Sequence, residues 1–143
     1  MYRNRTLWLS LIVIFLGGLL IFRTINKPTS KQEDILWGHY KVETKIIDGN
    51  KLRLVVADTP ERWEKGLMFV RKPVSDFDGM IFIFPSATTQ TFWNMNTFEN
   101  LKIYWMKDGK ILGTSDLPSI EKSNGIVTVS SPEPANIVVE VIQ

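Results

Sequence analysis

The chain begins with a stretch in which almost every position is apolar. Residues 7–22 read LWLSLIVIFLGGLLIF, with no charged residue and with only Ser10 and Gly17–Gly18 among the large apolar side chains. Together with its flanking residues, this run approaches the roughly 20 residues that cross about 30 Å of hydrocarbon as a helix. It has no polar face, so it does not match an amphipathic surface helix. We therefore predict a transmembrane helix within residues 1–25.

A cleaved signal peptide is the competing interpretation of the same run, since it also begins with basic residues and has an apolar centre. Cleavage requires small residues just beyond that centre, but the run passes directly into Phe22-Arg23-Thr24-Ile25. This favours an uncleaved signal anchor. Basic residues flank both ends, so the positive-inside rule is nearly balanced. Of the two orientations, we expect a cytoplasmic N-terminus and an extracytoplasmic C-terminal domain in the cell envelope.

Residues 26–34 (NKPTSKQED) contain a proline and no large apolar side chain, which is typical of a solvated linker. A single domain is then expected over residues 35–143, because the remaining length matches one ordinary domain. Within it, short apolar or alternating segments are separated by turn residues such as Asp48-Gly49-Asn50. These patterns predict strands over residues 40–47, 51–57, 78–85, 90–94, 102–106, 110–114, 126–130 and 136–142.

One segment has the signals of a short helix. Thr59 can cap the free amides, Pro60 suits the first helical position, and Gly66 suits a left-handed exit. We expect Trp63 and Leu67 to face the core from this helix. Many short strands and one short helix predict a mostly β fold, namely a small barrel- or sandwich-like domain behind the transmembrane helix.

Charge and composition exclude several classes of function. Residues 1–34 carry five Lys or Arg against two Asp or Glu, a net charge of +3, which leaves −1 of the total +2 for the domain. Such a domain lacks the basic surface that binds nucleic acid. The chain has no cysteine and a single histidine, His39, so no thiolate or multi-histidine metal site is expected. We predict no metal and no cofactor.

Several motifs then occur in a characteristic order. They are Ala57–Arg62, Gly66–Phe69, Asp78–Phe84, Phe92–Thr97, and Pro134-Ala135 leading into Val138–Val141. In this order they resemble the family known as domain of unknown function 192, small secreted or membrane-anchored proteins of bacteria and archaea. The resemblance covers the chain from about residue 42 onward. It implies a compact, β-rich fold and brings no established activity.

The chain departs from the family pattern at three places. Where the family has Trp-Met-Lys/Arg-Asn/Asp, this chain has Trp93-Asn94-Met95-Asn96 and loses the basic residue. Where the family has Pro-Leu/Ile-Asp, it has Asn100-Leu101-Lys102. Val70 also separates the Gly-Leu-Met-Phe motif from Arg71. If these charged positions form a site in the family, this chain has altered it.

Trp93 is the most suggestive candidate for binding, because an indole face beside the amides of Asn94 and Asn96 can hold a sugar ring or a peptide group. We expect Trp93, Asn94 and Asn96 to line a binding groove, and Arg71 is a further candidate residue of that groove. The alternative is a core tryptophan beside turn-forming asparagines. The first functional hypothesis is a binding or accessory module of the envelope that recognises a glycan, a peptide or a membrane protein.

Catalysis has no positive evidence in the sequence, which lacks a G-x-S-x-G elbow and a phosphate-binding loop. A carboxylate-dependent hydrolase acting on envelope glycan or peptide stays as the alternative, with Asp78 and Glu140 as its acids. Both residues also have structural interpretations. Asp78 precedes a glycine and suits a turn, and Glu140 lies between two valines, where we expect a partly buried ion pair with Arg62 or Arg71.

Overall fold

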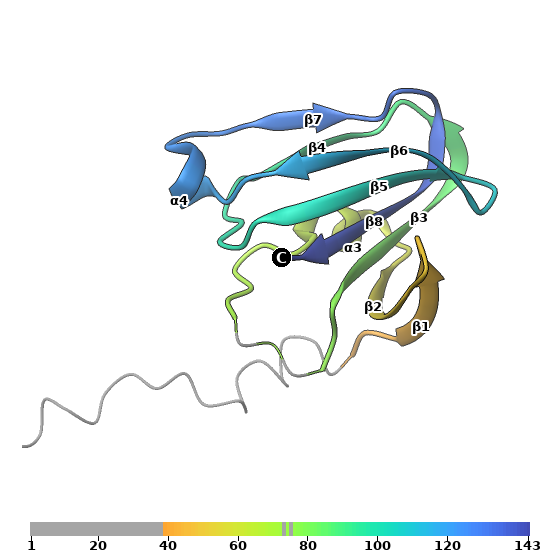
Figure 1. Ribbon diagram of the computed structural model, residues 1–143, viewed down its shortest axis with the longest axis horizontal. Coiled ribbons are helices and arrows are strands. Elements are labelled where there is room, and N and C mark those ends of the chain that lie inside the picture. Colours follow the sequence, from red (N-terminus) through yellow and green to blue (C-terminus); the bar gives the residue numbers. More distant parts are fainter. Residues whose placement is uncertain (1–38, 73, 75) are drawn as a thin grey trace, which may run out of the picture. The chain divides into compact units, whose positions relative to one another are not determined.

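The computed structural model describes residues 39–72, 74 and 76–143, drawn in colour in Figure 1. The predicted transmembrane helix, the linker and the expected domain start at Ile35 lie outside these residues. Within the described part of the chain, no helix combines the length and the apolar character needed to cross a membrane. Residues Tyr40–Gln143 form one compact unit.

The described residues contain eight strands and two short helices, close to the segments that the sequence predicts. The strands are β1 (Val42–Ile47), β2 (Asn50–Ala57), β3 (Gly79–Thr88), β4 (Thr91–Trp93), β5 (Leu101–Lys107), β6 (Lys110–Leu117), β7 (Thr128–Ser130) and β8 (Ala135–Ile142). The helices are α3 (Pro60–Lys65) and α4 (Ile120–Ser123). The second helix was not predicted; Ser119 caps it by accepting a hydrogen bond from the Lys122 amide at 3.1 Å.

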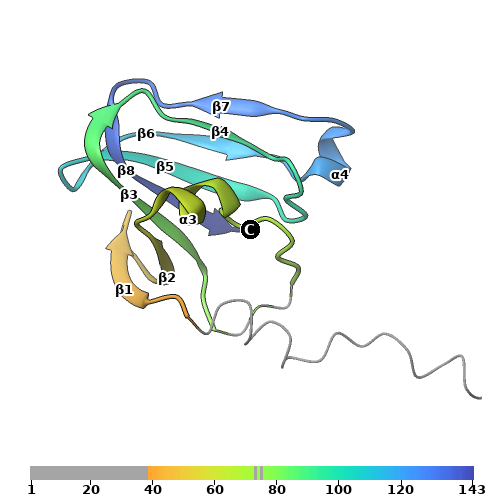
Figure 2. The ribbon, with the colours of Figure 1, turned by 180° about the vertical axis from the view of Figure 1, so that it is seen from behind.

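Six strands form one sheet in the order β1-β2-β3-β8-β5-β6, while β4 and β7 form a separate two-stranded ribbon. Neighbouring strands are antiparallel except β2 and β3, which run parallel. A parallel pair needs a crossover connection, and α3 lies in this one. Figure 2 shows α3 in front of β3 and β8 on one face of the sheet.

The sheet is open. Its edge strands β1 and β6 are not hydrogen-bonded to each other in the described part of the chain, so the predicted barrel does not close. The mostly β class is confirmed, and of the two predicted architectures, barrel or sandwich, the closed barrel is wrong. Closure would require β6 to pair with β1, whereas among the described residues β1 pairs with β2 and β6 pairs with β5.

Both faces of the central strands are covered. On one face, Ile47 of the β1–β2 hairpin belongs to a cluster with Ile81, Tyr104 and Val139. On the other face, Phe92 of β4 packs edge to face against Phe82 and Trp105, with ring centroids 4.8 and 5.6 Å away. Because side chains alternate along a strand, this second face also carries Glu140 of β8.

Candidate functional site

A cleft opens over the second face of the sheet, between α3 with the residues after it and the strand β4. It contains about 260 Å³ of space, counting the part open to solvent. Its lining comes from four parts of the fold: the segment Trp63–Met68, Phe82 of β3, Phe92 to Thr97 around β4, and β8. From β4 and the turn after it the lining residues are Phe92, Trp93 and Thr97, and from β8 it is Glu140.

Glu140 provides the buried acid of this cleft. Its side chain is only 4% exposed, because it extends from the middle of the sheet between Met80 of β3 and Ile103 of β5, its register partners. Both of these neighbours are fully buried and apolar. The strand register therefore places a carboxyl group among hydrocarbon side chains at the bottom of the cleft.

One oxygen of this carboxyl group has no hydrogen-bond partner that would compensate for its burial. Its Oε2 atom is buried and accepts no hydrogen bond, and no described residue forms an ion pair with it. Burial away from water disfavours the charged form and raises the pKa of Glu140 to about 8. The predicted ion pair with Arg62 or Arg71 is wrong, because Arg62 binds Asp58 at 2.7 Å and Arg71 binds Glu121 at 2.9 Å.

Gly66 brings the backbone close to this acid. A Cβ atom at this position would lie 3.9 Å from Glu140 Oε2 and 3.6 Å from the Phe82 ring. The residue has φ of +47° and ψ of −142°, a conformation that glycine adopts without steric conflict. The sequence correctly predicted that α3 ends at Gly66 with a positive φ, but the ψ of −142° is not that of the expected left-handed exit. Nothing in the sequence showed that this residue lies next to Glu140.

Aromatic side chains form much of the cleft wall. The Trp63 indole N–H donates a hydrogen bond to the Ala57 carbonyl at 3.0 Å, and its ring lies 5.0 Å from that of Phe84. The prediction that Trp63 faces inward from α3 agrees with these contacts. Trp93, by contrast, is 45% exposed, so it is not a core tryptophan. It lines the same cleft as Glu140.

The two asparagines beside Trp93 do not line the cleft. Asn94 is fully buried; its amide donates to the Pro118 carbonyl at 2.9 Å and to Ser123 Oγ at 2.8 Å, and its Oδ1 accepts from the Val127 amide at 2.8 Å. Asn96 occupies a left-handed turn with φ of +55°, and its carbonyl accepts from the Phe69 amide. Asn94 therefore ties β4 to the segment around α4, and Asn96 forms a turn.

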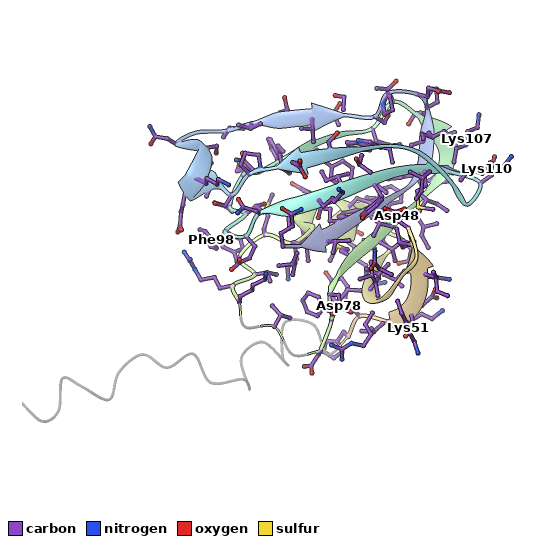
Figure 3. The ribbon with its side chains drawn as sticks, in the orientation of Figure 1. Asp48, Lys51, Asp78, Phe98, Lys107 and Lys110 are labelled. Atoms are coloured by element: carbon purple, nitrogen blue, oxygen red, sulfur yellow. The ribbon has the colours of Figure 1, made fainter. Side chains whose placement is uncertain are left out.

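Arg71 also lies outside the cleft lining. Its guanidinium group stacks over the Phe98 ring at 3.8 Å and pairs with Glu121, and both charged side chains are more than half exposed. Phe98 lies in the connection between β4 and β5, labelled in Figure 3. These contacts link the segment after α3 to this connection and to α4.

Asp78 and Glu140 do not meet in the cleft. Asp78 lies just before β3 (Figure 3), where its Oδ2 accepts a hydrogen bond from the Arg53 amide at 2.7 Å. Its own amide donates to the Arg53 carbonyl, and its carbonyl accepts from the Ile142 amide. These bonds fix the start of β3 against β2 and β8. They join Asp78 to neighbouring strands, so the expected turn-forming role of Asp78 stays a prediction.

The chemistry that this arrangement offers is recognition by a buried acid in an aromatic cleft. A protonated Glu140 can donate a hydrogen bond, and an ionised one can receive a cation. Glu64 and Lys65 add charged groups to the lining. Over the described residues, no group of three or more His, Cys, Asp or Glu side chains converges in a way that could hold a metal ion.

Fold and cleft together define the class of this protein: a small domain with an open β-sheet and a buried carboxyl group at the bottom of a surface cleft. The chain belongs to the family of domain of unknown function 192, whose model, described as "Uncharacterized ACR", matches residues 43–143. This confirms the resemblance in the sequence motifs. No curated protein matches the chain.

Two solved structures share the fold. A protein from Sinorhizobium meliloti 1021, described as a "putative transcription regulator", is 27% identical with a TM-score of 0.54. The match covers 72% of this chain and 79% of that one. A protein of unknown function from Novosphingobium aromaticivorans DSM 12444 is 23% identical with a TM-score of 0.52, and the match covers 73% of this chain and 82% of the other. These likenesses support the fold.

Proposed function

We propose that this protein is a membrane-anchored binding module of the cell envelope, whose β domain holds a small ligand, or one side chain or sugar of a larger one, in the cleft over Glu140. The ligand belongs to a glycan, a peptide or a membrane protein. The anchor is the apolar run of residues 7–22, and the domain lies on the extracytoplasmic side.

The observation that carries the binding role is the buried Oε2 atom of Glu140, which has no hydrogen-bond partner. A buried polar atom without a hydrogen bond destabilises a fold, so its presence calls for an explanation outside the packing of the core. Here the carboxyl group lines a cleft that also contains Trp63 and Trp93. A concave site with aromatic walls and one perturbed acid is the usual form of a small-molecule site.

Binding is tested with the full-length chain and a library of envelope glycans, short peptides and small fragments, followed by NMR on the indole N–H signals of Trp63 and Trp93. Ligands of the cleft should shift both signals, and Trp93→Ala should weaken their binding at least tenfold. Arg71→Ala is the matched control outside the cleft and should leave affinity unchanged. Ligands that bind both variants as tightly as the wild type, or a library without any binder, would remove the cleft from consideration.

The anchor is tested separately by fractionation of cells that produce the full-length chain. The protein should stay with membranes after an alkaline carbonate wash and dissolve only in detergent. Recovery in the aqueous fraction with an intact N-terminus would contradict the anchor without affecting the cleft. Protease treatment of intact cells, with a cytoplasmic protein as control, should degrade residues 35–143 if the domain is extracytoplasmic.

A further inference from the structure

The charges that line the cleft are few and nearly balanced. Glu64 and Lys65 are adjacent on α3, and Glu140 is the third ionisable group. The Lys65 ammonium lies 5.9 Å from the centre of the Tyr40 ring, a residue that does not line the cleft. No ion pair between described residues joins this ammonium group to Glu140. Among the residues that the structure describes, no ion pair provides this deep acid with a cation.

We infer that the cleft recognises its ligand through an ammonium group, which binds between the Glu140 carboxylate and the surrounding aromatic side chains. This inference rests on the proposed binding function and names the chemistry of its ligand. Candidate ligands of this class are a lysine side chain, a free amino terminus, an amino sugar or a quaternary amine.

Two features of the lining act together on a cation. The negative charge of the buried carboxylate attracts the positive charge of the ligand. This attraction is strong where water is excluded. Aromatic faces attract cations through their ring quadrupole, most strongly for tryptophan. Trp63, Phe82, Phe92 and Trp93 all line this cleft. A neutral hydrogen-bond acceptor could also pack against the rings but would gain neither the charge attraction nor the cation–π attraction.

The choice of residue also favours a cation. A site that needed only a neutral hydrogen-bond donor could use a hydroxyl or an amide, which is less costly to bury than a carboxyl group. Glutamate at this position becomes useful when the ligand brings a positive charge. On binding below pH 8, the Glu140 carboxyl group releases one proton to solvent, while the ammonium group keeps its own protons.

The experiment uses the full-length chain and three probes: n-butylammonium chloride, the uncharged 1-butanol, and N-methylacetamide as a neutral acceptor. n-Butylammonium should shift the indole signals of Trp63 and Trp93 and bind at least tenfold more tightly than 1-butanol. Glu140→Gln should abolish this preference. Glu64→Gln removes a carboxylate from the rim of the same cleft and should reduce affinity less than threefold.

The pH dependence gives a second, independent readout. If only the ionised acid binds the ammonium group, affinity should rise about tenfold from pH 6 to pH 7 and level off above pH 8. Affinity for n-butylammonium that is independent of pH would overturn the inference. Binding of N-methylacetamide without binding of n-butylammonium would also overturn the inference. That result would still support the proposed binding function. Failure of all three probes would overturn the inference, and the broad library would then decide the function.

Discussion

Gly79 lies against the backbone of Glu140, so closely that a Cβ atom at Gly79 would come within 1.9 Å of the Glu140 carbonyl oxygen. This contact joins the start of β3 to the strand that carries the acid of the cleft. Gly79 follows Asp78, which is itself hydrogen-bonded to Arg53 and Ile142. The glycine is therefore required by the close approach of two strands.

Gly79→Ala should destabilise the fold by roughly 3 kcal/mol or more, because neither backbone segment can move away without losing ladder hydrogen bonds. Gly109→Ala is the matched control. Gly109 has φ of +81° and open space around it, so its substitution should cost only about 1 kcal/mol of backbone strain. Urea unfolding followed by tryptophan fluorescence measures both. Equal effects of the two substitutions would contradict the close approach at Gly79.

Stability should fall as the pH rises from about 4.5 to 8. The pKa of Glu140 is about 8 in the folded protein and near the ordinary glutamate value of 4.5 in the unfolded chain. Between these values the folded state holds a proton that the unfolded state has lost, so the free energy of unfolding decreases by about 1.4 kcal/mol per pH unit. Below 4.5 both states hold the proton, and above 8 neither does.

Glu140→Gln should abolish this slope and make the protein more stable than the wild type at pH 8, whereas Glu64→Gln should keep the slope. The pKa of Glu43 is lowered to about 2 by hydrogen bonds from Lys41 and Lys45. The stabilisation of the fold by Glu43 is present above pH 4.5 and is lost as the pH falls toward 2. It therefore does not contribute to the slope between pH 4.5 and 8. Unfolding curves collected from pH 4 to 9 test the prediction. An unchanged slope in Glu140→Gln would count against a neutral buried acid.

Asn94 and Trp93 are adjacent, yet their substitutions should have opposite consequences. Asn94→Ala removes a fully buried amide and leaves the Val127 amide without its acceptor, so it should destabilise the fold by about 2 to 3 kcal/mol. Trp93→Ala shortens a side chain that is nearly half exposed and should cost about 1 kcal/mol or less. Thermal unfolding of both variants checks this order, and a reversed order would place Trp93 in the core.

Arg71→Ala should cost less than about 1 kcal/mol, since exposed ion pairs and cation–π contacts contribute little in water. The loss should shrink further in 1 M salt, because salt screens the pair with Glu121. Glu121→Gln should reproduce the salt-dependent part while retaining the stacking on Phe98. A large loss of folding stability in Arg71→Ala that does not change with salt would mean that Arg71 has a role beyond these two contacts.

Much of the fold follows from local patterns. All eight strands of the described residues fall within a few positions of the predicted segments, because alternation and turn residues act over short distances. The helix at Ile120–Ser123 was missed because it is a single turn with little periodicity. The barrel was wrong for another reason. Closure depends on which strands pair at the edges, and that is decided by contacts between distant residues.

The site was less predictable than the fold. Trp93 and Glu140 were both candidates, but the sequence offered no reason to place them in one cleft, and it assigned Glu140 an ion pair that does not form. Asn94 and Asn96 are near Trp93 in sequence, and Arg71 was placed in the same groove, but all three have other contacts. Trp63 was predicted to face the core from a helix, and Gly66 was predicted to end that helix. A charged residue flanked by valines was the one available signal for the buried acid.

The titration of Glu140 itself tests the central claim most directly. The side-chain carboxyl carbon of Glu140 can be followed by ¹³C NMR in the full-length chain, with Glu140→Gln used to assign the signal. The free protein should titrate with a midpoint near pH 8, and saturation with n-butylammonium should lower that midpoint by at least one pH unit. A midpoint near 4.5 that does not move with the probe would contradict both the buried, unpartnered acid and its role in the cleft.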